Sequence, residues 1–258
     1  PLGWIILDRP SKRNAVNDRL LGDLDAAVEA LESNDDVRVV LLRAEGPVFS
    51  AGIDLKWLAA GAAATLAPQK DEGARLRRFI AWIQRILERL ESIEKPTIAL
   101  VHGFCGGLGL EMALPCDLRI AAEGTELGLP EIVLGIIPDC GGTTRLTRIA
   151  GLARAKELIL SGDMIDAETA ERYGVVNQVV PAEELVEAGR AWGTKLAKRS
   201  PAALGLAKKL IDLGHGLDRH THQQLEALTQ SILMTSPRLG PQMMAGMQEL
   251  RAAAKKEG

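Results

Sequence analysis

Two carboxylates lie eight residues apart in a segment that is otherwise apolar or glycine, GLPEIVLGIIPDCGGT at residues 128–143. They belong to Glu131 and Asp139. Charged side chains are rarely buried unless they are paired or used. Acids held close together push one pKa upward, so that one stays protonated while its partner is ionised. The segment therefore predicts proton chemistry. The structural alternative is that Asp139 caps the following helix and Glu131 pairs with an arginine such as Arg119 or Arg145.

A further acid follows a glycine-rich turn in VHGFCGGLGLE, residues 101–111. Met112 stands where a dinucleotide fingerprint would need glycine, and no GK[ST] follows, so neither a dinucleotide site nor a phosphate loop is predicted. The glycines permit close approach of the backbone to a ligand. Glu111 lies in the first turn of the expected helix. It either takes part in chemistry or simply interacts favourably with the positive end of the helix macrodipole.

The segment FSAGIDLK, residues 49–56, places small residues between an expected strand and a helix start. Such a turn leaves backbone N–H groups pointing into a cleft, where they can bind an anion or an oxyanion. The structural alternative is an ordinary turn in which Asp54 caps the helix.

The composition limits the classes of protein. The chain has 258 residues, 47% apolar and 25% charged, with a net charge of −3 and no basic block. These values are typical of a soluble globular protein, and the charge pattern gives only a weak indication of nucleic-acid binding. No apolar run is long enough for a membrane span, and the sequence opens on an apolar strand-like run rather than a signal peptide. The cysteines, Cys105, Cys116 and Cys140, lack disulfide or zinc spacing, so we expect a cytoplasmic protein.

The elements that must position these acids alternate along the chain. Apolar and β-branched runs predict strands, and apolar residues at helical spacing predict a helix over 14–31 and a long amphipathic helix over 76–90 that Pro96 stops. Asp166 is the expected N-cap of a short helix that ends before Gly174. The expected strand segments are 4–10, 37–45, 97–103, 118–124 and 174–181.

From Ser200 onward only helical patterns follow, over 201–213, 219–235 and 241–255. Ser200 and Pro201 read as an N-cap and a first helical residue. We therefore predict an α/β core over 1–195 and a C-terminal helical segment over 196–258. Apolar residues left on these helices pack either on a neighbouring subunit or on the chain's own core.

Together, the segments resemble the crotonase superfamily, also called the enoyl-CoA hydratase/isomerase family. The resemblance covers nearly the whole chain, from LDRPSKRNAVN through FSAGIDLK, HGFCGGLGLEMALPCDLRIAAE and GLPEIVLGIIPDCGGTTRLTRIAG to AERYGVVNQVVP. It implies a spiral core of repeated ββα units, followed by helices that mediate trimerisation, with two trimers often stacked as a hexamer.

The resemblance also implies acyl-CoA thioester substrates and an enolate held by an oxyanion hole. The two donors would be the backbone N–H groups of Ile53 and Leu108. The family usually has glycine at position 108; leucine keeps the N–H and adds a side chain at the floor of the cleft. Substrate-binding positions would be Ala51, Asp54, Leu55, Gly107, Arg13 and Ala15, with Lys12 or Arg13 near a phosphate. No metal and no cofactor are expected, since coenzyme A is part of the substrate.

The acids decide the expected reaction. In enoyl-CoA hydratases two glutamates hold a water between them, and Glu111 and Glu131 match those positions. Asp139 stands where hydratases typically have glycine. Dienoyl-CoA isomerases carry an acid eight residues after the middle one, as here, although that branch usually has Asp in place of Glu111. FSAGIDL and the long insert over 57–75 also resemble this branch.

The leading hypothesis is therefore hydration of a 2-enoyl-CoA in fatty-acid metabolism such as β-oxidation. A double-bond isomerase that uses Asp139 is the alternative with the same fold. An alternative of another class is a non-catalytic protein that binds CoA thioesters, and binding of nucleic acid is a more distant one. We expect a homotrimer or hexamer, without nucleic acid or membrane partners.

Overall fold

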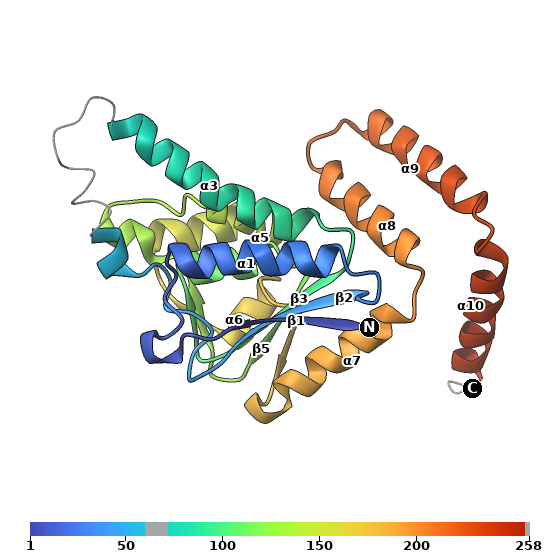
Figure 1. The fold of residues 1–258 in the computed structure, drawn as a ribbon, viewed down its shortest axis with the longest axis horizontal. Helices are drawn as coiled ribbons and strands as arrows, with labels where there is room; N and C mark the ends of the chain where they lie inside the picture. The colour runs from blue at the N-terminus through green and yellow to red at the C-terminus, as the bar shows by residue number, and fades with distance from the viewer. Residues whose placement is uncertain (60–71, 256–258) are drawn as a thin grey trace. The chain divides into compact units, whose positions relative to one another are not determined.

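The apolar segments predicted as strands pair into a sheet in the N-terminal part of the chain (Figure 1). Every neighbouring pair in it is parallel. A parallel sheet is covered on both faces, which explains why its strands are nearly continuous apolar runs rather than alternating ones. In spatial order the strands are β1 (Leu2–Leu7), β2 (Val39–Ala44), β3 (Thr97–Val101), β5 (Leu118–Ala122) and β8 (Gln178–Val180).

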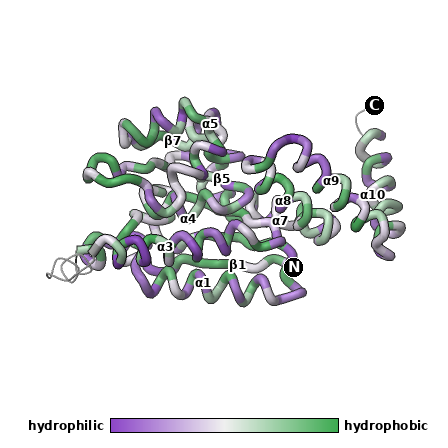
Figure 2. The backbone as a smooth tube through the Cα atoms, turned by 90° about the horizontal axis from the view of Figure 1, so that it is seen from above, coloured by the Kyte–Doolittle hydropathy of each residue, from purple (hydrophilic) through white to green (hydrophobic). Residues whose placement is uncertain are grey.

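Successive strand residues point to opposite faces of the sheet, so two cores form. On one face, Leu42 packs in the main core, to which α1 (Asp18–Glu32) and α3 (Glu72–Ser92) contribute. On the other face, Leu41 packs in a second cluster that is closed by α7 (Leu185–Ala197). Hydrophilic and hydrophobic residues alternate along α1 and α3 in Figure 2, as expected for helices with one buried side.

Helix α1 begins later than the apolar spacing predicted. The sequence pattern placed its start at residue 14, whereas the helix starts at Asp18 with Asn17 as the N-cap, whose Oδ1 accepts the Leu20 N–H at 3.0 Å. Asn14 instead has a φ of 51° and a fully buried side chain. Its amide donates to the carbonyls of Glu45 and Val48, so a tertiary contact overrides helix formation there.

A second, smaller sheet has the order β4 (Phe104–Gly106), β6 (Glu126–Gly128) and β7 (Ile165–Asp166). The expected short helix is α6 (Ala167–Arg172), and its N-cap is confirmed because Asp166 Oδ1 accepts the Thr169 N–H at 2.7 Å. Further elements in the described part of this region are the 3₁₀ turns η1 (Pro10–Lys12), η2 (Pro130–Leu134) and η3 (Ala182–Glu184), and the helices α4 (Leu108–Ala113) and α5 (Gly142–Ser161).

The structure is a computed structural model that describes residues 1–59 and 72–255, so the predicted insert over 57–75 lies largely outside the described residues. The chain divides into two compact units, Pro1–Ala197 and Lys198–Gly258. None of the helices in the described ranges is long and apolar enough to cross a membrane.

The second unit consists of α8 (Pro201–Gly214), α9 (Arg219–Met234) and α10 (Leu239–Ala254). Ser200 is the N-cap of α8, as predicted, since its side chain accepts the Ala203 N–H. These helices expose many large apolar side chains: Ile211, Leu213, Leu228, Ile232, Met234, Met243, Met244, Met247 and Leu250.

Candidate active site

Glu111 is a buried acid on α4, with only 2% of its surface exposed. The helix starts after Gly107, whose φ of 54° and ψ of −131° suit glycine and turn the chain sharply out of β4. Every residue of α4 is buried. The Glu111 N–H donates to the Gly107 carbonyl, so the acid lies on the first full turn of this buried helix.

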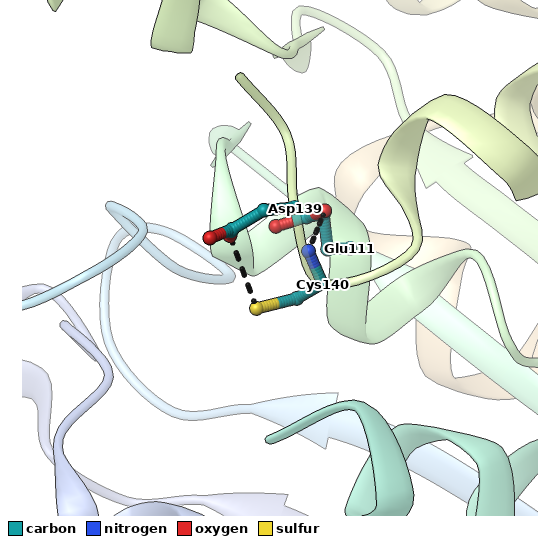
Figure 3. Close-up of side chains that lie close together, drawn as sticks. All are labelled: Glu111, Asp139 and Cys140. Atoms are coloured by element: carbon teal, nitrogen blue, oxygen red, sulfur yellow. Dashed lines mark hydrogen bonds between the residues drawn. The ribbon is translucent and has the colours of Figure 1, made fainter. Parts of the chain in front are cut away.

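The Glu111 carboxylate is held by two backbone N–H groups of the turn that leads into α5, of which Figure 3 shows the one from Cys140. Its Oε1 accepts the Cys140 N–H at 2.9 Å and the Gly142 N–H at 2.8 Å. A Cβ on Gly142 would lie 2.8 Å from the same oxygen, so glycine is needed for this approach. The arrangement orients the carboxylate without supplying a cation.

Glu131 approaches the same helix from η2. A Cβ placed on Gly107 would lie 3.1 Å from Glu131 Oε1, so the carboxyl group lies against the glycine turn that starts α4. Its other oxygen, Oε2, is buried and has no hydrogen-bond partner among the described residues. A buried acceptor that is left unpaired is costly and is often retained for function.

Burial and the neighbouring carboxylates displace the pKa values of these acids. Burial raises the pKa of Glu111 to about 8, and the Glu131 and Asp139 carboxylates add to the rise while the N–H groups of Gly142 and Cys140 oppose it. Burial also raises the pKa of Glu131, with a contribution from Asp139. Neighbouring acids with displaced pKa values are typical of acid–base sites.

Asp139 lies in the same turn but does not cap α5, whose N-cap is Gly141. Its Oδ1 accepts a hydrogen bond from the Cys140 thiol at 3.4 Å (Figure 3). The structural alternative for Glu131 is wrong as well. Arg145 pairs with Glu91 at 2.7 Å, and Arg119 donates to backbone carbonyls.

The two predicted oxyanion donors come from adjacent loops. Gly52 has a φ of 86°, and a Cβ on it would lie 2.8 Å from the Gly106 carbonyl oxygen and 3.7 Å from the Leu108 nitrogen. Among the residues the structure describes, no acceptor takes the N–H of Ile53 or of Leu108. Leu108 opens α4, so its N–H has no acceptor within the helix. Its side chain is 5% exposed and packs in the main core.

The remaining predicted positions lie on the loops beside these donors. Ala51 donates its N–H to the carbonyl of Arg13 at 2.9 Å, which joins the two loops. Arg13 is an exposed residue, and its guanidinium carbon lies 5.7 Å from the Phe104 ring centre. Ala15 is half-buried and Leu55 is exposed. The Asp54 side chain has a structural role that the sequence offered as an alternative. It pairs with Arg9 at 2.8 Å and accepts the Lys56 N–H, at the start of a helical turn.

One group of side chains in the described part of the chain has the composition of a metal site. Ligand atoms of Glu111, Asp139 and Cys140 all lie within 4.8 Å of one another. Carboxylate and thiolate groups are zinc ligands. However, burial and the surrounding acids raise the pKa of the Cys140 thiol, which disfavours the thiolate that binds metal. The absence of a resident metal stays a prediction.

The backbone donors of Cys140 and Gly142 were not predicted as site groups. The CGG turn after Asp139 was their only local signal, because glycine permits the close approach that the Glu111 carboxylate makes. Gln84 was also missed. Its Nε2 donates to the Asp139 carbonyl at 2.6 Å, and no local pattern marks a glutamine on an amphipathic helix as part of a distant turn.

Comparison with known proteins identifies relatives of the chain. The enoyl-CoA hydratase/isomerase family pattern matches residues 2–245. A probable mitochondrial enoyl-CoA hydratase 2 of Arabidopsis thaliana is 38% identical over 90% of this chain and 75% of that protein. A short-chain-enoyl-CoA hydratase of Clostridium acetobutylicum is 35% identical over 86% of this chain and 82% of its own length. The crystal structure of an enoyl-CoA hydratase from Bacillus anthracis superimposes with a TM-score of 0.86 at 34% identity, covering 98% and 93% of the two chains.

The chain belongs to the enoyl-CoA hydratase/isomerase family, and it has the crotonase fold that the sequence motifs predicted. It is therefore an enzyme of acyl-CoA metabolism. Its kinship with the dienoyl-CoA isomerase branch, suggested by Asp139 and the insert, stays a prediction.

Proposed function

We propose that the protein adds water across the double bond of a 2-enoyl-CoA thioester, with Glu111 and Glu131 as the acid–base pair. The observation that carries this proposal is a buried acid, Glu111, beside a half-buried one, Glu131, both with raised pKa values and neither bonded to a cation among the described residues. It is supported by the hydratases named among the relatives.

In the proposed reaction, the thioester carbonyl accepts the N–H groups of Ile53 and Leu108, which stabilise negative charge on that oxygen as the enolate forms. Removing one such donor typically costs about 10²–10³ in rate. One glutamate, as a carboxylate, takes a proton from water while the water oxygen attacks C3. The other glutamate, as a carboxylic acid, supplies a proton to C2. General acid–base catalysis of this kind is worth about 10²–10⁴.

The proposed path of the coenzyme A group runs along two joined loops. We propose that Arg13, Ala15, Ala51 and Leu55 contact it, with Gly107 near the thioester. The support is the Ala51–Arg13 hydrogen bond and an exposed arginine at position 13. Asp54 would contribute only by holding the loop, since its carboxylate is engaged with Arg9. No cofactor beyond the CoA substrate is proposed.

The test of the reaction is a product analysis. The protein is incubated separately with a 2-enoyl-CoA and a 3,5-dienoyl-CoA, and products are followed by mass spectrometry and ultraviolet absorbance. A 2-enoyl-CoA product heavier by one water supports the hydratase. Binding of CoA thioesters without turnover of any would instead indicate the non-catalytic class.

A double-bond isomerase is the second candidate, because Asp139 places a third carboxylate beside Glu111 and Glu131. Here Asp139 would move a proton along a conjugated dienoyl chain, and the product would keep the substrate's mass. D139G restores the residue that hydratases typically carry at this position. Loss of dienoyl isomerisation with retained hydration in this variant would assign Asp139 to that activity.

We also propose that the chain assembles as a homotrimer or a dimer of trimers, with the C-terminal helical segment as its oligomerisation part. The support is the apolar surface that α9 and α10 expose, including Leu228, Ile232 and Met247. Light scattering on purified protein measures the mass in solution. A chain of 27.7 kDa that elutes as a monomer at micromolar concentration would contradict this assembly. A cytoplasmic location stays a prediction.

A further inference from the structure

The turn that carries Asp139 and Cys140 presents its groups in two directions. The N–H groups of Cys140 and Gly142 point to Glu111 Oε1. The carbonyl oxygens of Asp139 and Cys140 are bonded by side chains from other elements. Gly141 has a φ of 105°, in the region that only glycine adopts freely. Because Gly141 imposes little conformational preference, contacts with the rest of the protein set the aim of the N–H groups. They are the backbone bond from the Arg145 N–H to the Gly141 carbonyl at 2.8 Å and the side-chain bonds to the two preceding carbonyls.

Arg145, on the first turn of α5, makes the main contact of this kind. Its Nη1 donates to the Cys140 carbonyl at 3.1 Å, and a Cβ on Gly141 would lie 2.0 Å from the same nitrogen. Its Nε and Nη2 donate to Glu91 Oε2 at 3.0 and 2.7 Å. The arginine side chain is 8% exposed, so the guanidinium is held in one orientation by bonds on two sides.

Helix α3 supplies both ends of this support. Gln84 donates to the Asp139 carbonyl, and Glu91 fixes Arg145. The two residues are seven apart, which is close to two helical turns, so they lie on one face of α3. That face therefore bonds to two successive carbonyls of the turn, one directly and one through Arg145.

We propose that Arg145 is a positioning residue: by fixing the Cys140 carbonyl against Glu91, it aims the Cys140 and Gly142 N–H groups at the Glu111 carboxylate. Its importance for catalysis rests on the proposed role of Glu111 in proton transfer. The charged groups that face Glu111 are Glu131 from η2 and Asp139 from the turn. The Arg145 guanidinium is directed to Glu91 and a carbonyl instead, so we infer that it acts through geometry.

The inference can be tested without measuring enzyme turnover, by following the Gly142 amide in NMR spectra as the pH changes. Only Gly107 and Gly142 follow another glycine in the sequence. In deuterated protein labelled with [1-¹³C,¹⁵N]glycine, a carbonyl-edited TROSY spectrum therefore selects these two amides. The Gly142 N–H donates to Glu111, so the chemical shift of this amide should change with pH as Glu111 ionises. E111Q assigns the resonance, because the Gly142 amide then loses that titration.

We compare R145K and R145M with the wild type. Lysine keeps the positive charge but cannot bond to Glu91 through two nitrogens while also reaching the Cys140 carbonyl. Both variants should move the Gly142 titration midpoint upward, since the anion loses well-aimed donors. If the arginine acts only through its charge, R145K will titrate like the wild type. If it only stabilises the fold, melting temperatures will fall while midpoints stay unchanged. Either result overturns the proposal.

Two further variants guard against misfolding and non-specific effects. E91Q keeps an acceptor of the same size for Arg145 and should shift the Gly142 midpoint less than R145K does. R154K changes an exposed arginine of the same helix that pairs with Glu157, and it should leave the midpoint unchanged. A wild-type midpoint in folded E91Q, R145K and R145M would refute the positioning role.

Turnover gives a separate readout. In R145K we expect kcat to fall about 10- to 100-fold, since displacement of a reacting group by about 1 Å costs on that order, with KM nearly unchanged. Absence of hydratase activity in the wild type would reject the proposed reaction but leave the amide titration as a valid test. A shifted midpoint with normal kcat would show that Arg145 positions Glu111 and that Glu111 does not limit the reaction.

Discussion

Two acids of the N-terminal unit lie in opposite electrostatic surroundings. Asp54 pairs with Arg9 and accepts N–H groups of the following turn, and the hydrogen bond from Arg9 lowers its pKa. Glu111 accepts two N–H groups but has no cation partner among the described residues, and burial raises its pKa to about 8. Both lie beside a loop that is predicted to bind substrate, but only one is electrostatically satisfied.

This difference separates an acid that maintains structure from one kept for chemistry. A structural carboxylate gains from being ionised and paired. A proton carrier must exchange its proton near neutral pH, which requires surroundings that disfavour the anion. Such surroundings reduce stability, as is common where function needs a strained or poorly solvated group. The comparison yields four predictions.

The largest effect is expected from removing the proton carrier. E111Q keeps the shape of the side chain and an oxygen for the two N–H donors, but it cannot exchange a proton. We expect kcat for hydration to fall by about 10²–10⁴. Steady-state kinetics measure this, and calorimetry with the hydroxyacyl-CoA product should show retained binding. Unchanged kcat in folded E111Q would remove Glu111 from the mechanism.

The oxyanion loop should be nearly as sensitive. In G52A, the new Cβ meets the Gly106 carbonyl at 2.8 Å and forces apart the loops that carry Ile53 and Leu108. Loss of one donor predicts a fall in kcat of about 10²–10³. G124A is the matched control, since Gly124 also has a positive φ, of 73°, but no atom within 4 Å of the added Cβ. Equal losses in both variants would contradict a specific role for the Gly52 turn.

Ionisation of the buried Glu111 should lower the free energy of unfolding of the protein. Its folded-state pKa of about 8 lies above the ordinary value of 4.5, so its stabilising contribution is complete below about pH 4.5 and is lost as pH rises to about 8. E111Q does not ionise and avoids this loss. We expect its free energy of unfolding to exceed the wild-type value by several kcal/mol above pH 8, since one pKa unit is worth about 1.4 kcal/mol.

Urea denaturation at pH 5 and pH 8.5 measures this difference. E157Q serves as the control, because the Arg154 hydrogen bond lowers the pKa of Glu157, the opposite direction. That variant should gain no stability as the pH rises. If the stability difference between E111Q and wild type does not grow with pH, burial does not raise the pKa of Glu111 in the folded protein.

The smallest effect is expected at the satisfied acid. D54N keeps a side-chain oxygen for the turn N–H groups and removes the charge opposite Arg9. Because this half-buried ion pair remains partly open to solvent, which screens its charges, we expect the melting temperature to change by less than about 4 °C, and by less still at high salt. Kinetics should show a small rise in KM with kcat retained. A large fall in kcat would place the Asp54 carboxylate in the reaction itself.

Much of the fold follows from local patterns. Apolar and β-branched runs predicted the strands of the main sheet, and the cap residues Asp166 and Ser200 predicted the starts of α6 and α8. The parallel pairing of the strands is seen only in the structure. The main local error was the start of α1. Asn14 sits within the apolar periodicity, but its amide is taken by the carbonyls of Glu45 and Val48, about thirty residues later in the chain.

The sequence by itself determined the family and the identity of the acids, because motif order and residue type are properties of the chain. The tertiary structure decided which groups surround them. Glu111 receives its donors from Cys140 and Gly142, and Arg145 turned out to pair with Glu91 rather than Glu131. These partners are brought together by the packing of α3, α4 and α5. Such contacts arise only when separate apolar faces are buried together, and no local pattern encodes them.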